Sequence, residues 1–240
     1  MPPSSSGPTM RLIALLLALG ATAATAQEVV EVPYRELETL APGLVTFDRL
    51  PARPYPGYDF DHGIAFPGGL LGEAFQGQSV EAERIDEGGP HDVLRGAPKA
   101  PLALRPGQPG QVVSLSLHEG FGSMALYPLG ALGQPDPLAR GEGAVAVLFR
   151  RDVCAVGLRV HTEYSSALGL NTGHRGNVTL TLYARDGTRI ALRQLTLPEG
   201  ITEHALFDPS ARIAGMTVEN RDPGGVALDD LRFGCPRLTG

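Results

Sequence analysis

The feature that most constrains the fold is the stretch NVTLTLYARDGTRIALRQLTL (177–197), where apolar and polar residues alternate on both sides of Asp186-Gly187. Neighbouring side chains of a strand point to opposite faces, so this alternation predicts two half-buried strands. An Asp-Gly pair supplies the positive φ that a tight turn requires. We therefore expect an antiparallel hairpin with Val178, Leu180 and Leu182 together on one face.

Short apolar segments recur along the rest of the chain, where they are interrupted by many of its 31 glycines and 21 prolines. This pattern is typical of a sandwich or a barrel. We predict an all-β fold, an antiparallel β-sandwich, with one helical turn in 29–40 and long loops with short edge strands in 68–110. The further predicted strands are 44–50, 62–69, 111–117, 144–149, 154–160, 203–207, 211–218 and 226–233.

The N-terminal region has the order of a secretory signal peptide. Arg11 precedes an apolar run from Leu12 to Leu19, and the small residues Ala24-Thr25-Ala26 follow. Such a run is too short to span a bilayer, and cleavage is expected after Ala26. The predicted organisation is a signal peptide (1–26), an N-terminal extension (27–43) and one sandwich domain (44–240). The protein is expected to be secreted or periplasmic, with no transmembrane anchor after cleavage.

Two cysteines and a mildly negative net charge further limit the compartment and the partners that we expect. Cys154 and Cys235 are 81 residues apart, and in an oxidising compartment an even pair predicts a disulfide. Two free buried thiols are the alternative. The formal net charge is −6, which argues against nucleic acid and anionic membranes as partners.

The last predicted strand carries an unexpected pair of carboxylates, Asp229 and Asp230, within GGVALDDLRFGCP (224–236). Alternation places one of them beside the core, whichever face is buried. An inward carboxylate needs a partner, because burying it alone costs several kcal/mol. A Ca²⁺ ion, an arginine and loop N–H groups are the candidate partners. A β-bulge at the pair is a further alternative that turns both side chains outward.

Three segments, VTFDRL, VTLTLYARDGTRI and GGVALDDLRF, together resemble secreted bacterial jelly-roll modules of the galactose-binding-like, carbohydrate-binding type. The resemblance implies a jelly-roll sandwich and a structural Ca²⁺ between the first and last strands. Carried onto this chain, it implies that Asp48 faces Asp229 or Asp230. A solvent-facing or arginine-paired aspartate is the alternative. The chain departs from similar exported proteins that end in a sorting tail, since it ends in CPRLTG.

Candidate ligand-binding residues gather in one loop, namely Tyr55, Tyr58, Asp59, Asp61 and His62. Its carboxylates and rings suit a cation or a sugar hydroxyl, and the alternative is a polar turn with aspartates that hydrogen-bond the backbone. His161 and Glu163 form a second candidate pair, for acid–base work or for a cross-strand ion pair. The chain has no Trp, which counts against a strong carbohydrate platform.

These observations predict an exported, non-catalytic binding or envelope-associated module, with a glycan or a cell-envelope component as partner. The sequence has no H-E-x-x-H zinc motif and no G-x-S-x-G serine elbow, so two common hydrolase templates fail. Two alternatives stay open. One is a secreted hydrolase acting on polysaccharide, and the other is a structural or adhesive surface protein.

Overall fold

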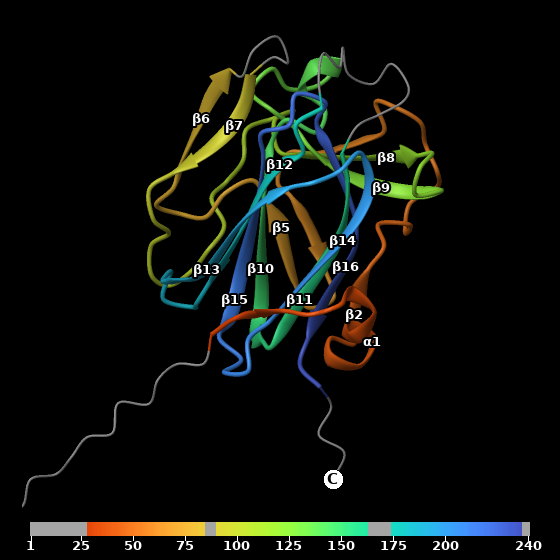
Figure 1. Ribbon diagram of the computed structural model, residues 1–240. Coiled ribbons are helices and arrows are strands. Elements are labelled where there is room, and N and C mark those ends of the chain that lie inside the picture. The colour runs from red at the N-terminus through yellow and green to blue at the C-terminus, as the bar shows by residue number, and fades with distance from the viewer. Residues whose placement is uncertain (1–27, 85–89, 163–173, 237–240) are drawn as a thin grey trace, which may run out of the picture.

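The computed structural model describes residues 28–84, 90–162 and 174–236. Two antiparallel sheets pack face to face as a β-sandwich, and a separate two-stranded hairpin flanks one end (Figure 1). The predicted all-β antiparallel sandwich is therefore confirmed. The predicted signal peptide and Glu163 lie outside the described residues.

The larger sheet has the strand order β1-β14-β11-β16-β9-β8-β3, and β2 pairs with β16 beside this path. All its pairs are antiparallel. Its strands are β1 (Val30–Glu31), β2 (Gly43–Val45), β3 (Tyr58–Phe60), β8 (Val113–His118), β9 (Ser123–Pro128), β11 (Ala155–Thr162), β14 (Gly200–Phe207) and β16 (Val226–Gly234).

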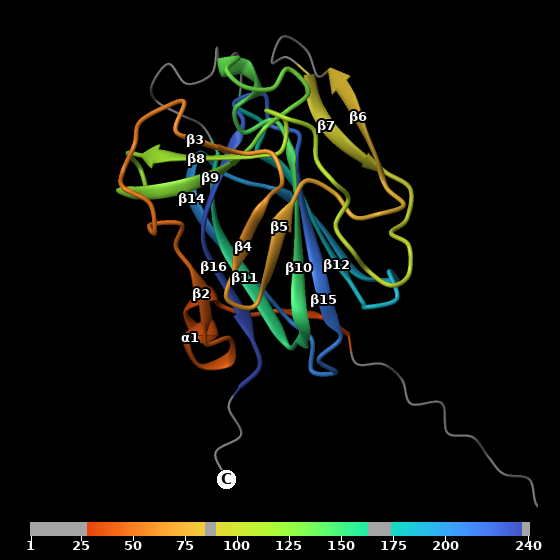
Figure 2. The ribbon, with the colours of Figure 1, turned by 180° about the vertical axis from the view of Figure 1, so that it is seen from behind.

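The smaller sheet has the order β13-β12-β15-β10-β5-β4, and Figure 2 shows β4 at its edge with β5 next to it. Its strands are β4 (Ile64–Phe66), β5 (Gly69–Gly72), β10 (Ala144–Val153), β12 (Asn177–Tyr183), β13 (Arg189–Thr196) and β15 (Ile213–Asn220). The remaining elements are the hairpin β6 (Ser79–Arg84) and β7 (Pro90–Arg95), the 3-10 turns η1 (Tyr34–Glu36) and η2 (Pro137–Ala139), and α1 (Leu37–Leu40).

The hairpin expected from the alternating stretch is present as β12 and β13. Gly187 has φ +84° in the connecting turn, which is the backbone that the Asp-Gly pair predicts. The Asp186 carboxylate accepts a hydrogen bond from the Thr188 N–H at 2.9 Å and closes the turn. As predicted, Val178, Leu180 and Leu182 share one face, and each is buried in the core.

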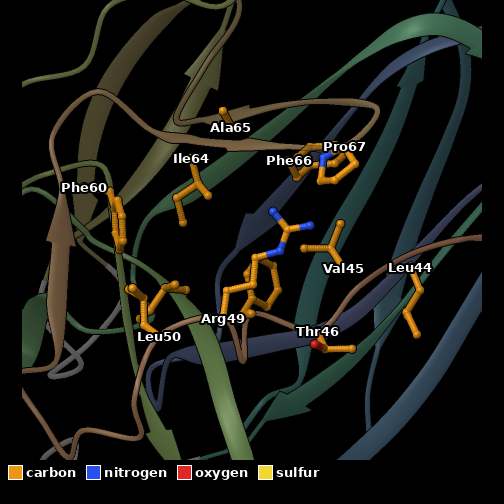
Figure 3. A pocket seen from close by; sticks show the side chains of 12 residues that line it. Leu44, Val45, Thr46, Arg49, Leu50, Phe60, Ile64, Ala65, Phe66 and Pro67 are labelled. Carbon is orange, nitrogen blue, oxygen red and sulfur yellow. The ribbon is translucent and has the colours of Figure 1, made fainter.

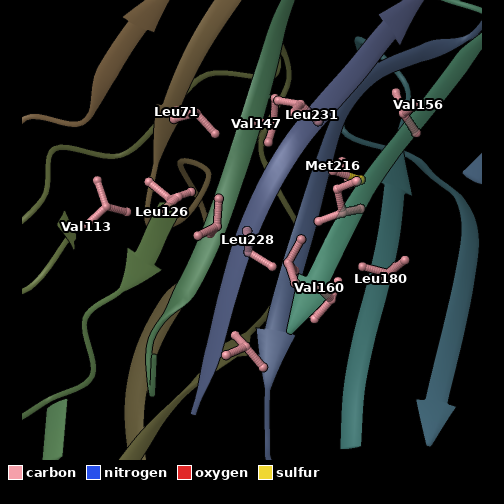
Figure 4. Close-up of a cluster of buried hydrophobic side chains, with 14 of the residues drawn as sticks. Leu71, Val113, Leu126, Val147, Val156, Val160, Leu180, Met216, Leu228 and Leu231 are labelled. Carbon is pink, nitrogen blue, oxygen red and sulfur yellow. The ribbon is translucent and has the colours of Figure 1, made fainter. Parts of the chain in front are cut away.

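The main core lies between the two sheets and is built from the inward residues of both (Figure 4). Its aliphatic side chains follow the period of two along each strand. Leu126, Val160 and Leu228 come from the larger sheet, and Val147 and Met216 from the smaller one. The disulfide Cys154–Cys235 is formed, with the two Cα atoms 4.8 Å apart, and it ties the β10–β11 turn to the end of β16.

The structure corrects two expected strand boundaries. The predicted strand 44–50 is too long, because β2 ends at Val45 and Phe47 has φ +61°. That backbone turns out of the sheet, and the Phe47 ring is buried in the core. The predicted strand 62–69 is divided, because β4 ends at Phe66 and β5 begins at Gly69. In 68–110 the described residues include β5, β6 and β7, and β5 lies between β4 and β10 rather than at an edge as expected.

The N-terminal segment packs onto the larger sheet. β1 pairs with β14, and Leu37 of α1 is buried against Ala155 and Ala205. The single helical turn expected in 29–40 is present as η1 and α1. Among the described residues, no helix is both long and apolar enough to cross a membrane.

Candidate functional site on the outer face of the larger sheet

A row of buried polar side chains lies on the face of the larger sheet that points away from the core. Ser114, Ser116 and His118 on β8 alternate with core residues and are at most 3% exposed. Polar groups that are buried outside a core need hydrogen-bond partners. We call this set, completed by the residues described below, the polar face: Ser116, His118, Ser123, Tyr127, Arg140, His161 and Asp229.

Small residues and a sharp turn of the sheet make room for the polar face. Ala125 and Ala227 pack beside Tyr127, and all three are fully buried. β9 and β16 share only one registered pair, Leu126 and Leu228, and β8 and β9 run steeply across the other strands (Figure 1). This bend brings residues of β8 close to β11, although two strands separate them in the sheet order.

Arg140, just after η2, is the charged centre of the polar face. Its guanidinium carbon is 3.7 Å from the centre of the Tyr127 ring and 5.1 Å from that of Tyr55. Nη2 donates a hydrogen bond to Ser116 Oγ at 2.7 Å. Nε and Nη1 have no hydrogen-bond partner among the described residues, although Arg140 is only 4% exposed. Buried arginines are normally paired with acceptors, and here the side chain of Tyr127 is the group that lies closest to the guanidinium and interacts with it.

Two histidines form a hydrogen-bonded pair beside this arginine. The Phe121 N–H donates to His118 Nδ1 at 3.0 Å, and His118 Nε2 is 2.5 Å from His161 Nδ1. Since His118 Nδ1 accepts, the ring proton of neutral His118 lies on Nε2 and is donated to His161. Burial, the second ring and Arg140 lower the pKa of His118 to about 3. Burial also lowers the pKa of His161, so both rings are neutral near pH 7.

A β-bulge accommodates the two neighbouring carboxylates of the acidic doublet, Asp229 and Asp230. The pairing of β11 with β16 shifts register between Gly157 and Arg159, and Asp230 opposite has φ +49°. Arg159 Nη1 donates to Asp230 Oδ2 at 3.2 Å. The alternative of an arginine-paired aspartate therefore holds for Asp230.

Asp229 lies on the polar face, where it is 3% exposed. Ser123 Oγ donates to its Oδ2 at 2.7 Å, and the Asp230 N–H donates to its Oδ1 at 2.8 Å. Burial raises the pKa of Asp229 to about 7, and the nearby charges of Asp230 and Asp48 act in the same direction. Near neutral pH this carboxyl is able both to accept and to donate a hydrogen bond.

The predicted calcium ligands have other partners. Asp48 Oδ1 accepts a hydrogen bond from the Met124 N–H at 2.9 Å. Asp230 is paired with Arg159. In the part of the chain that the structure describes, no group of three or more His, Cys, Asp or Glu side chains is suited to a metal. A Ca²⁺ ion here would depend on backbone and water oxygens for most of its six to eight ligands.

The predicted binding loop contributes one residue to the polar face. Tyr55 lies near Arg140, as described, and its hydroxyl donates to Pro135 O at 2.5 Å. Asp61 instead accepts a hydrogen bond from the Gly110 N–H at 2.7 Å, and Tyr58 donates to Pro51 O at 3.2 Å. Asp59 and His62 are exposed. The pKa of Asp59 is nevertheless raised, first by partial desolvation of its carboxyl and second by the charge of Asp61.

Most of the polar face escaped the sequence analysis. The segment VSLSLH (113–118) places Ser114, Ser116 and His118 at alternate positions, which was the available signal for a polar row on one strand face. Arg140 carried no signal, because it lies in a loop. His161 was considered only together with Glu163.

A second buried polar cluster lies where β10 begins and the neighbouring strand β15 ends. Asn220 Nδ2 donates to Glu142 Oε2 at 3.0 Å, and Asp222 accepts from the Gly224 N–H at 2.9 Å. Burial and the charge of Asp222 raise the pKa of Glu142 well above its usual range. Burial likewise raises the pKa of nearby Asp92 to about 8. The carboxyl of Asp92 beside this cluster is therefore mostly protonated at neutral pH.

No protein-family model matches the chain, and no curated protein matches its sequence. The polar face is thus the strongest indication of a function. It combines a cation, two neutral imidazoles, a titratable carboxyl and aromatic rings, which suits hydrogen-bonded recognition of a polar ligand.

Proposed function

We propose that the protein is an exported, non-catalytic binding module of jelly-roll type that recognises a glycan through the polar face. The observation that carries this proposal is Arg140, a buried guanidinium that lies near two tyrosine rings and whose Nε and Nη1 meet the geometric criteria of a hydrogen bond with none of the described residues. The disulfide supports export, since such bonds persist in oxidising compartments.

The chemistry of the polar face favours an acidic or hydroxyl-rich sugar. A guanidinium presents parallel donors that match a carboxylate, and neutral histidines and Asp229 offer both donors and acceptors to hydroxyl groups. Tyr55 is the partly exposed member of the pair of rings around Arg140. A ligand therefore approaches from the side of Tyr55, whose ring provides a surface for a pyranose.

A glycan array that includes uronic-acid oligomers tests this function, with Tyr55→Ala as the diagnostic variant. We expect binding to an acidic glycan that falls at least about tenfold in Tyr55→Ala. Tyr58→Ala is the matched control, because Tyr58 begins the nearby strand β3 and its ring lies against Arg53 rather than Arg140. Equal loss in both variants, with unchanged thermal melting, would refute this site. No binding to any glycan would favour the structural or adhesive alternative.

The hydrolase alternative is favoured by Asp229, a buried carboxyl on the polar face that accepts a hydrogen bond from Ser123 and whose pKa is raised by burial to about 7. A group that titrates near the working pH is suited to general acid–base catalysis. Release of reducing ends from a bound polysaccharide, lost in Asp229→Asn and retained in Asp59→Asn, would establish this alternative and overturn the non-catalytic proposal.

A further inference from the structure

An apolar pocket of about 190 Å³ opens at the edge of the sandwich, and no residue of the polar face belongs to its lining (Figure 3). The edge strands β3 and β4 of the two sheets lie on one side of it, and β2 with the segment that follows it lies on the other. Its wall is formed mainly by apolar side chains, including Val45, Leu50, Phe60, Ile64, Phe66 and Leu115.

The pocket is continuous with the core. Phe66 and Leu115 belong to the main core, and Val45, Leu50 and Ile64 pack against it while staying partly exposed. Partly exposed apolar side chains around a hollow leave apolar surface in contact with water. Covering this surface with an apolar ligand is favourable, roughly in proportion to the area covered.

One cation stands at this pocket. Arg49 is exposed and belongs to its lining, and its guanidinium lies between Val45 and the segment of Ile64 to Pro67 (Figure 3). Arg49 forms no ion pair or hydrogen bond with any described residue. The neighbouring Asp48 carboxylate is held instead by the Met124 N–H.

We propose that this pocket binds a small amphiphile, with its acyl chain between the sheet edges and its carboxylate on Arg49. The apolar wall selects the chain, and the single cation selects an anionic head over a neutral or cationic one. The modest volume favours a chain of medium length. The site is separate from the polar face and does not depend on the glycan proposal.

Displacement of a fluorescent fatty-acid probe tests this proposal on the purified protein. Decanoate should displace the probe at micromolar concentration, and affinity should rise roughly fourfold per added methylene from hexanoate to decanoate. Decyltrimethylammonium should be at least about tenfold weaker than decanoate.

Two variants distinguish the contribution of the ligand's carboxylate head to binding from that of its acyl chain. Arg49→Gln should weaken decanoate about tenfold and leave decanol unchanged, since only decanoate carries a charge. Leu50→Trp should fill the pocket and weaken both ligands, with a thermal melt showing that the variant is folded. Arg189→Gln on β13, an exposed arginine at the far edge of the smaller sheet, is the matched control and should change nothing.

Three results would overturn the proposal. The first is no displacement of the probe by decanoate up to about 1 mM, an affinity too weak to count as a site. The second is equal binding of decanoate and decyltrimethylammonium, or equal loss in Arg49→Gln and Arg189→Gln. The third is unchanged binding of decanoate and decanol in Leu50→Trp while the thermal melt shows that the variant is folded, because the acyl chain would then lie outside this pocket.

Discussion

Replacing Asp92 with Asn should make the protein more stable at alkaline pH and change the shape of its pH–stability curve. Asp92 on β7 is 3% exposed, and its Oδ2 has no hydrogen-bond partner among the described residues. Its backbone N–H donates to Glu142 O at 2.9 Å, which fixes it against the smaller sheet. Burial raises its pKa to about 8, Glu73 adds to this, and Arg105 opposes it.

The sign follows from proton linkage. The unfolded chain releases this proton near pH 3.9 and the folded chain near pH 8, so the folded state binds more protons between these values. The contribution of Asp92 to the free energy of unfolding is therefore largest below about pH 4, and it falls by about 1.4 kcal/mol per pH unit up to about pH 8. Asn is neutral throughout, so Asp92→Asn should gain about 4 kcal/mol relative to the parent between pH 4.5 and 8. Any burial cost of the amide is independent of pH and cancels.

Urea unfolding at pH 4.5, 6 and 8, with the disulfide intact, measures this difference. Burial also raises the pKa of Glu73 and Glu142, so the comparison must be between the variant and the parent rather than within one curve. Glu199→Gln removes an exposed carboxylate and serves as the control. Parallel curves for Asp92→Asn and the parent would show that Asp92 is ionised in the folded state, and the reasoning would fail.

Three further predictions concern stability. Replacing both cysteines with Ala should cost about 4–5 kcal/mol in urea unfolding, because the disulfide closes 81 residues; an unchanged midpoint would contradict this. Leu126→Ala, at a position 1% exposed, should cost about 2–5 kcal/mol, whereas Leu192→Ala on exposed β13 should cost far less. If Asp48 and Asp229 hold a Ca²⁺ ion, the Tm should be higher in millimolar Ca²⁺ than in EDTA, and this difference should disappear in Asp48→Asn. Equal Tm values in Ca²⁺ and EDTA would refute the calcium site.

Local patterns predicted the strands because their causes are local. The hairpin β12–β13 follows from alternation and one Asp-Gly turn, and Gly187 has the expected positive φ. The strand predicted for 44–50 failed at Phe47, because burial of that ring in the core outweighed the extended backbone that β-branched and aromatic residues favour. Tertiary packing decided this boundary, and the local sequence does not contain that information.

Local sequence patterns could not predict the polar face, for a different reason. His118 and His161 are far apart in sequence, and they meet because β9 and β16 pair at one point and the sheet bends there. Arg140 reaches Tyr127 from a loop. Contacts of this kind depend on strand order and register, which alternation along one strand does not specify.

Around the acidic doublet, Asp229 and Asp230, the spacing of the apolar residues changes from even to odd, and this change indicates a β-bulge. Val226 and Leu228 face the core, and so do Leu231 and Phe233, yet Leu228 and Leu231 are separated by an odd number of positions. In a regular strand such residues point to opposite faces. One extra residue restores the core face after the doublet, and Asp230, with its positive φ and its bond to Arg159, fills that role. The bulge thus keeps four apolar side chains in the core and leaves Asp229 on the outer face, beside Ser123.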